Sequence, residues 1–229
     1  MTPPPRPDAT LFLASSVHDM KNSISVLIGT IQRFIARTEP ENSETHREMS
    51  QMLYETQRIN GNLIQLLTLY KLGNDLYPFN PETQEIAEFA QMAASQVGPL
   101  LSSCGIALEV DVEDDCYWEF DADLVNGIVV NAMNNAAHYT KSAIRLVIAT
   151  VNDALEIRVE DDGGGFPQRM VDEGIAAMRG VDFSTGSTGL GLYFAAVSAK
   201  MHRNRKEEGS IRLENGGGLG GGCFILRLP

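Results

Sequence analysis

Cysteine is scarce in this chain of 229 residues. Its three cysteines, Cys104, Cys116 and Cys223, are odd in number and far apart, which is typical neither of a disulfide framework nor of a zinc site. No apolar run approaches the roughly 20 residues that a membrane-spanning helix needs. The opening residues, MTPPPRPDAT, lack the basic and apolar stretches of a secretory signal. The sequence therefore predicts a cytoplasmic protein with no direct membrane insertion.

Positively charged residues are also few relative to negatively charged ones. The chain has 18 Lys and Arg against 30 Asp and Glu, a formal net charge of -12 at pH 7. Such a surface repels the phosphates of nucleic acid and of anionic lipid, so no nucleic-acid partner is expected. A hydrophobic fraction of 43% and a charged fraction of 21% are ordinary for a folded protein, and the length suffices for two modest domains.

Two amphipathic helices are predicted in the first third of the chain. Apolar residues recur at alternating steps of four and three, which is typical of a helix in a bundle. In the first helix they are Leu13, Val17, Met20, Ile24, Leu27, Ile31 and Phe34, and after the polar stretch RTEPENSETHRE the pattern resumes at Met52, Thr56, Ile59, Leu63, Leu66 and Tyr70. An antiparallel pair of such helices cannot enclose a core alone. We therefore expect a homodimeric four-helix bundle over residues 11–76, after a flexible tail at 1–10.

A histidine and an aspartate are neighbours on the first of these helices. His18 follows the seam residue Val17, so it is expected on the flank of the bundle, with Asn22 one turn later on the same face. Asp19 can orient the imidazole or remove its proton. A histidine on a helix is more often a surface residue without function. The pair of His18 and Asp19 therefore indicates a function only together with the segments further along the chain.

A domain boundary is predicted around 72–84, where LGNDLYPFNPETQ gathers glycine, proline, asparagine and aspartate. Beyond it, helical and strand patterns alternate. Helices are predicted over 85–103, 121–139 and 188–201, and strands over 106–112, 116–120, 143–151, 154–161, 209–214 and 222–228. The order predicts an α+β protein in which residues 77–229 form an α/β sandwich, with a mixed sheet covered on one face by helices.

Candidate binding residues lie in three segments of this second domain. In NAMNNAAHYT, Asn131, Asn135 and His138 share one face of a helix, where an amide oxygen suits magnesium if phosphate oxygens complete its coordination. A helix cap or a solvated face would also explain the asparagines. In EDDGGGFP, glycines let a flat ligand approach and a carboxylate can accept from an exocyclic amine, although a tight turn explains the glycines equally well. STGLGL opens a helix whose free N–H groups suit phosphate oxygens.

Two further stretches are predicted as loops. Residues 168–187 lack periodicity and end in VDFSTGST, which predicts a mobile loop, here called the lid, rather than a packed element. The run GGGLGGG at 216–222 does not have the G-x-G-x-x-G spacing of a dinucleotide fold. It predicts a flexible turn between the last two strands.

Four short segments stand in an order that resembles the catalytic core of the two-component sensor histidine kinases, with a GHKL-type ATP-binding domain. They are HDMKNS at 18–23, NAMNNAAHYT at 131–140, EDDGGGFP at 160–167 and STGLGL at 187–192. The resemblance covers nearly the whole chain. It implies that the γ-phosphoryl group of ATP, bound with Mg²⁺, passes to His18 and then to an aspartate of a response regulator. It also implies Asp19 as general base, Asn22 as the residue that orients water in a reverse phosphatase reaction, and a separate sensor protein as a further partner.

The resemblance also implies which residues bind the nucleotide. They are Asn131, Asn135, His138, Tyr139, Asp161, Gly163, Gly165, Thr188, Gly189, Leu190 and Gly191, with Asn135 as the magnesium ligand and Asp161 as the reader of the adenine amino group. Three positions depart from the family pattern: His138 replaces a common lysine, Ser187 a glycine, and Ser23 a common proline. His138 and Ser187, together with the short lid, leave an alternative open, a histidine phosphotransferase that relays phosphate through a degenerate ATP-binding domain without using ATP. The related gyrase, MutL and chaperone ATPases rank last because they lack the His18 helix.

Overall fold

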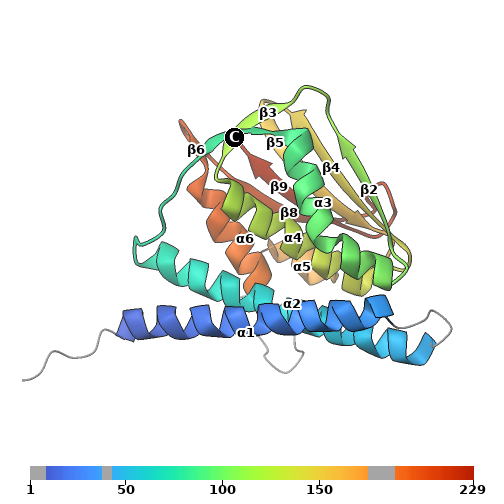
Figure 1. Ribbon diagram of the computed structural model, residues 1–229. Coiled ribbons are helices and arrows are strands. Elements are labelled where there is room, and N and C mark those ends of the chain that lie inside the picture. Colours follow the sequence, from blue (N-terminus) through green and yellow to red (C-terminus); the bar gives the residue numbers. More distant parts are fainter. Residues whose placement is uncertain (1–8, 38–42, 175–188) are drawn as a thin grey trace, which may run out of the picture. The chain divides into compact units, whose positions relative to one another are not determined.

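The computed structural model describes residues 9–37, 43–174 and 189–229. The chain divides into two compact units between Leu76 and Tyr77, within the predicted linker stretch. The first unit is a pair of helices, and the second combines helices with a sheet (Figure 1).

The N-terminal unit consists of α1 (Ala9–Arg37) and α2 (Ser43–Gly73), which pack against each other. Val17 of α1 and Leu53 of α2 are buried, at 7% and 1% exposure. The periodic apolar pattern thus produced the two long helices that it predicts, and the helical hairpin is confirmed.

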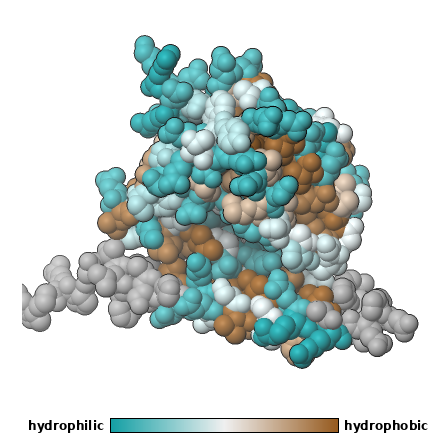
Figure 2. Space-filling model, turned by 45° about the horizontal axis from the view of Figure 1, so that its top comes forward, coloured by the Kyte–Doolittle hydropathy of each residue, from teal (hydrophilic) through white to brown (hydrophobic). Residues whose placement is uncertain are grey.

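Each apolar stripe of the hairpin divides into two rows with a spacing of seven residues. One row is buried or half-buried: Val17, Ile24 and Ile31 on α1, and Thr56, Leu63 and Tyr70 on α2. The other, here called the outer apolar row, consists of Met20, Leu27, Phe34, Met52, Ile59 and Leu66, each more than half exposed. Apolar side chains are visible on the surface of the hairpin in Figure 2. A single hairpin therefore buries only one of its two rows.

The C-terminal unit is built on a five-stranded sheet with strand order β2-β4-β5-β9-β8. Its strands are β2 (Ala107–Val112), β4 (Ala143–Val151), β5 (Ala154–Asp161), β8 (Ser210–Asn215) and β9 (Gly222–Leu228). β2 runs parallel to β4 and the other neighbours are antiparallel, so the sheet is mixed as predicted. A two-residue turn at Asn152 and Asp153, both with positive φ, joins β4 to β5 as a tight hairpin requires.

Helices cover one face of this sheet (Figure 1): α3 (Ile86–Ser103), α4 (Ala122–Tyr139) and α6 (Leu190–Met201). Side chains alternate between the two faces of a strand, and Ile144, Leu146 and Ile148 of β4 point to the helices and are fully buried. The helices add Phe89, Leu100, Ile128 and other buried apolar side chains to the same core. The predicted α+β sandwich is confirmed.

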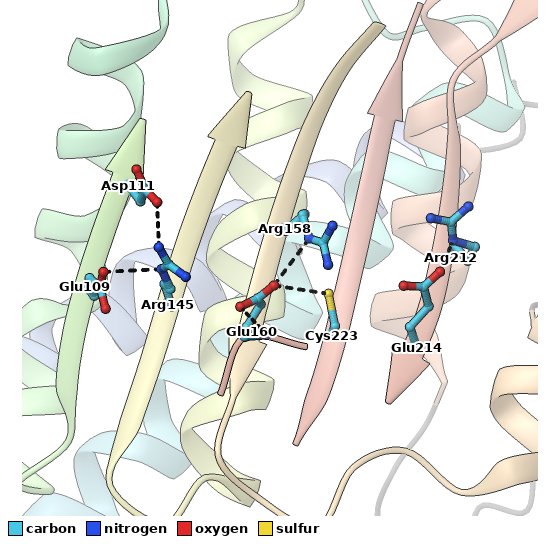
Figure 3. A network of polar contacts seen from close by, with 9 residues as sticks. Glu109, Asp111, Arg145, Arg158, Glu160, Arg212, Glu214 and Cys223 are labelled. Carbon is cyan, nitrogen blue, oxygen red and sulfur yellow. Dashed lines mark hydrogen bonds and ion pairs between the residues drawn. The ribbon is translucent and has the colours of Figure 1, made fainter. Parts of the chain in front are cut away.

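The opposite face of the sheet carries charged side chains (Figure 3). Arg145 reaches Asp111 and Glu109 at 2.6 and 3.3 Å, Arg158 reaches Glu160 at 3.3 Å, and Arg212 reaches Glu214 at 2.7 Å. Most of these groups are partly exposed, so each ion pair contributes little to stability. Glu160 is the exception at 4% exposure.

β3 (Tyr117–Phe120) agrees with the strand predicted over 116–120, but its partner β1 (Glu82–Glu85), with which it forms a separate two-stranded sheet, was not predicted. The short strands β6 (Arg203–Asn204) and β7 (Glu207–Glu208), which pair in another sheet, were not predicted either. α5 (Gln168–Glu173) replaces the start of the stretch that we predicted as a loop, because six residues are too few to display a helical period. The remainder of the predicted lid, 175–187, lies outside the described residues.

Candidate functional site

A side-chain cap sets the start of α4, which carries the candidate asparagines. Asp121 precedes the helix, and its Oδ1 accepts from the N–H of Leu124 at 3.0 Å. The hydroxyl of Tyr77 donates to the same oxygen at 3.0 Å, and the N–H of Asn80 donates to Oδ2 at 3.0 Å. Burial and the bond to Asp121 raise the pKa of Tyr77, which keeps the phenol protonated as a donor. Asp121 thus fastens the start of the C-terminal unit to α4.

A buried histidine completes this end of α4. His202 is 5% exposed, and its Nε2 accepts from the N–H of Asp121 at 3.1 Å. Nδ1 lies 3.0 Å from the carbonyl oxygen of Ser198. Because Nε2 is the acceptor, the ring proton is assigned to Nδ1, which donates to Ser198. Burial lowers the pKa of His202, so the residue acts as a neutral link between the end of α6 and the start of α4.

The candidate face of α4 meets the first turn of α6. A Cβ on Gly191 would lie 2.5 Å from Nδ2 and 2.9 Å from Oδ1 of Asn131, so only glycine allows this approach. Gly189 precedes the helix with a left-handed φ of 61°, and Leu190 is its half-buried first residue. The asparagine segment and the STGLGL segment are therefore brought together, although Thr188 lies outside the described residues.

Asn135 lies one turn beyond Asn131 on α4, and its side chain is exposed whereas that of Asn131 is half-buried. An exposed amide offers an oxygen ligand of the kind that magnesium prefers, and magnesium usually keeps water or phosphate oxygens at its other positions. The residues present at this end of α4 thus fit a magnesium ion that a nucleotide brings with it.

The end of α4 meets the glycine segment that follows β5. His138 and Tyr139 are both exposed, and their ring centroids lie 4.8 Å apart in an edge-to-face arrangement. A Cβ on Gly163 would lie 2.3 Å from the carbonyl oxygen of Tyr139. The structure thus places the backbone of Tyr139, a residue with an exposed side chain, beside the segment that contains Asp161.

Asp162 fastens this junction and was not assigned a role from the sequence. The hydroxyl of Ser142 donates to its carboxylate at 2.6 Å and the N–H of Lys141 at 2.7 Å, and the N–H of Ser142 and the hydroxyl of Thr140 also donate. These donors, those of Ser142 first, hold the pKa of Asp162 well below its usual range. The charged carboxylate therefore ties the end of β5 to the turn after α4.

Asp161 ends β5 on the helix-covered side of the sheet and is 7% exposed. Its Oδ1 accepts from the N–H of Gly163 at 2.8 Å and from the N–H of Gly222 at 3.1 Å. Within the part of the chain that the structure describes, no hydrogen bond reaches Oδ2. One oxygen of the carboxylate is held by the backbone, and the other can accept from the amino group of a ligand.

Glycine at 163 and 165 is required by contacts inside the protein. A Cβ on Gly165, which has a φ of 78°, would lie 2.6 Å from Oδ1 of Asn215. The N–H of Phe166 donates to that oxygen at 2.7 Å, and Nδ2 of Asn215 donates to the carbonyl oxygen of Phe166 at 2.9 Å. The tight-turn explanation therefore accounts for both glycines, and it is compatible with a ligand nearby.

The predicted phosphoacceptor segment lies within α1, which is continuous through residues 18–23. Asp19 and Asn22 are three residues apart and both exposed. The side chain of His18 lies outside the described part of the structure.

Some residues that position the site were missed from the sequence. Asp121 carried a usable signal, an aspartate at the first position of the helix predicted over 121–139. His202, Asp162 and Asn215 carried none, because their partners are 81, 20–22 and 49 residues away along the chain. In residues 9–37, 43–174 and 189–229, no helix combines the length and apolar character needed to cross a membrane.

Comparison with known proteins gives a family for this arrangement. Residues 120–229 match the family model described as histidine kinase-, DNA gyrase B-, and HSP90-like ATPase. The sensor protein SrrB of Staphylococcus aureus is 23% identical over 224 residues, covering 95% of this chain and 37% of its own length. The chain thus spans well under half the length of the curated relatives that it matches.

Solved structures agree in fold. Full-length ShkA in complex with AMPPNP gives a TM-score of 0.63 at 18% identity, covering 95% of this chain and 45% of that one. The histidine kinase AdeS of Acinetobacter baumannii gives a TM-score of 0.57 at 16% identity, covering 92% of this chain and 96% of that one. The catalytic domain of the histidine kinase ThkA gives a TM-score of 0.56 at 18% identity, covering 66% of this chain and 95% of that one. Residues 120–229 therefore form an ATP-binding domain of the histidine kinase, DNA gyrase B and HSP90-like type, and the chain as a whole is similar to the catalytic core of sensor histidine kinases.

Proposed function

We propose that this chain is a cytoplasmic protein-histidine kinase that transfers the γ-phosphoryl group of Mg-ATP to His18 and then to an aspartate of a response regulator. The approach of Gly191 to Asn131 is the observation that carries the proposal, because it unites the two segments that would bind phosphate. The free N–H groups at the start of α6 then face the same region as the amides of α4.

Each candidate residue has a distinct role in this proposal. Oδ2 of Asp161 accepts from the adenine amino group, and Tyr139 lies against the base. Asn135 supplies an amide oxygen to magnesium, which would neutralise phosphate charge during transfer. The ATP-binding domain would catalyse the transfer by positioning the nucleotide and neutralising its charge, and none of its residues forms a covalent bond to the phosphoryl group.

The acceptor helix carries the remaining roles. Asp19 removes a proton from the His18 imidazole or orients it, so that a neutral ring nitrogen attacks phosphorus. Asn22, on the same exposed face, orients a water molecule that dephosphorylates the response regulator. Replacing Asn22 with alanine is expected to abolish this phosphatase activity and leave autophosphorylation intact.

A homodimer through the hairpin is part of the proposal. The outer apolar row exposes Met20, Leu27 and Phe34 on α1 at 54%, 55% and 56%, at steps of seven residues. A row with this spacing matches the seam of a helical bundle, and a second hairpin would cover it. Apolar patches of this kind are unusual on an isolated soluble domain.

The test is incubation of the purified chain with γ-labelled Mg-ATP, scored for acid-labile and base-stable label. We expect label on the wild type and on His46→Gln, a control that removes the other histidine of the helical unit, and no label on His18→Gln. Equal label on His18→Gln would refute the assignment of the acceptor. Absence of both label and nucleotide binding in the wild type would refute the kinase and favour a phosphotransferase supplied by another kinase.

A further inference from the structure

The GGGLGGG turn is an ordered part of the nucleotide-site framework. It joins β8 to β9 as predicted, and backbone hydrogen bonds close it internally, from Gly216 N–H to the oxygen of Gly221 at 2.8 Å and from Gly220 N–H to the oxygen of Gly217 at 2.8 Å. The predicted turn between the last two strands is therefore present. The sequence did not predict its further hydrogen bonds to Glu160 and Asp161, because these partners are about 60 residues earlier in the chain.

Two consecutive carboxylates at the end of β5 hold this turn from opposite faces of the sheet. Glu160, on the charged face, accepts from the N–H of Gly218 at 2.9 Å through Oε2 (Figure 3 shows Glu160 beside Cys223). Asp161, on the helix-covered face, accepts from the N–H of Gly222 at 3.1 Å. The Asp161 carbonyl oxygen also accepts from the N–H of Gly221 at 3.0 Å. The turn therefore straddles the end of β5.

The fit between the turn and Asp161 has no room for another side chain. A Cβ on Gly221 would lie 2.4 Å from the carbonyl oxygen of Asp161, and a Cβ on Gly222 would lie 2.7 Å from its Oδ2. The Gly222 position also lies 3.0 Å from the ring of Phe166, whose backbone is held by Asn215. A substituent at 222 would therefore push on Oδ2, the carboxylate oxygen that accepts no hydrogen bond from the described residues.

Burial makes these donors important for the orientation of the carboxylate. Asp161 is 7% exposed, and a carboxylate removed from water must be compensated by hydrogen-bond donors. Its two donors, the N–H groups of Gly163 and Gly222, both bind Oδ1. Hydrogen bonds to a charged acceptor are stronger than neutral ones, so they fix which oxygen is presented to a ligand.

We propose that Gly222 and Asn215 are positioning residues for base recognition, which hold Asp161 and the Phe166 loop so that Oδ2 of Asp161 meets the exocyclic amino group of adenine. This inference rests on the proposed nucleotide-binding function. Guanine carries a carbonyl oxygen at the equivalent position, which cannot donate to a carboxylate. The C-terminal turn therefore determines the preference for ATP over GTP without touching the nucleotide.

The test compares dissociation constants for ATP and GTP, by isothermal titration, between the wild type and Gly222→Ala. We expect the dissociation constant for ATP to rise by about tenfold or more and that for GTP to change little, because a charge-assisted hydrogen bond to the base is lost. The maximal rate of His18 labelling at saturating ATP should stay within about twofold of the wild type, since the phosphate contacts are untouched. Gly98→Ala is the matched control, because no atom lies within 4 Å of its added Cβ.

A second variant covers the case in which Gly222→Ala does not fold. Asn215→Ala removes both hydrogen bonds to Phe166 at an exposed strand end, and it should also lower the ATP to GTP affinity ratio. Asn215→Asp keeps the acceptor but loses the donor, so it should fall between Asn215→Ala and the wild type. A folded Gly222→Ala or Asn215→Ala with wild-type affinities for both nucleotides would overturn the inference.

The failure of the proposed function gives a different result. A wild-type chain that binds no ATP would refute nucleotide binding itself. A wild-type chain that binds ATP but leaves His18 unlabelled would refute the kinase and leave the role of Gly222 open to the same titration.

Discussion

The backbone N–H of Asp121 donates to Nε2 of His202 over 3.1 Å, so a neutral imidazole joins the start of α4 to the end of α6. Protonation of Nε2 would place a second hydrogen against the Asp121 N–H and break this bond. Because burial lowers the pKa of His202 in the folded protein, the unfolded chain takes up this proton at a higher pH than the folded chain does.

The free energy of unfolding should therefore fall as the pH drops below the ordinary histidine value of about 6.5. The unfolded state binds more protons there, which is the condition for stability to rise with pH. Urea unfolding at about pH 7.5 and about pH 5.5 would measure the difference for the wild type and His202→Gln. In His202→Gln, the difference in unfolding free energy between the two pH values should be smaller than in the wild type. An identical pH dependence in both proteins would contradict the assignment of this pH dependence to His202.

Replacing Asp121 with alanine should lower the free energy of unfolding by about 2 kcal/mol, because the helix cap and two further hydrogen bonds are lost. Tyr77→Phe removes only one of the three and should cost about 1 kcal/mol. Asp123→Ala is the control, since this exposed neighbour in the first turn of α4 should change stability by less than about 0.5 kcal/mol. Equal effects of Asp121→Ala and Asp123→Ala in urea unfolding would show that the cap is unimportant.

Charge in the outer apolar row should weaken the proposed dimer. Leu27→Asp combined with Ile59→Asp should raise the dimer dissociation constant by more than about tenfold, because both side chains are expected at a covered seam. Val26→Asp is the matched control, as Val26 is 67% exposed but lies outside the row. Light scattering over a concentration series would measure the dimer dissociation constants of both variants. A dimer weakened equally by Val26→Asp would argue for another interface.

Loss of the Asp162 carboxylate should loosen the turn after α4. In Asp162→Ala, the amides of Lys141 and Ser142 lose their acceptor, so their hydrogen exchange should accelerate by about tenfold or more. Asp172→Ala, which removes an exposed carboxylate on α5, should leave these two amides unchanged. Unchanged protection in Asp162→Ala would mean that the turn is held by other contacts.

Restoring a lysine at 138 should strengthen nucleotide binding. His138 is exposed at the end of α4, and an ammonium group there would add a charge toward the triphosphate. Exposed ion pairs contribute up to about 1 kcal/mol, so His138→Lys should lower the ATP dissociation constant by about two- to fivefold. Met92→Lys on α3 controls for net charge, and an equal gain in that variant would assign the effect to general electrostatics.

Local pattern predicted most of the secondary structure. The helices over 85–103 and 121–139 and the strands over 143–151 and 154–161 agree with α3, α4, β4 and β5 to within one residue at each end. These elements have strong apolar periodicity and clear turn residues at their ends. α5, β1, β6 and β7 were missed, since two to six residues contain too little pattern.

The chain by itself determined the helical hairpin, the mixed sandwich and the order of the four motif segments, because each depends on neighbours a few residues apart. Only the tertiary structure decided that the apolar stripe of the hairpin splits into a covered and an outer row. It alone brought Gly191 to Asn131 and the glycine turn to Asp161. Such contacts join residues about 60 positions apart, and their partners are selected by the packing of the whole unit.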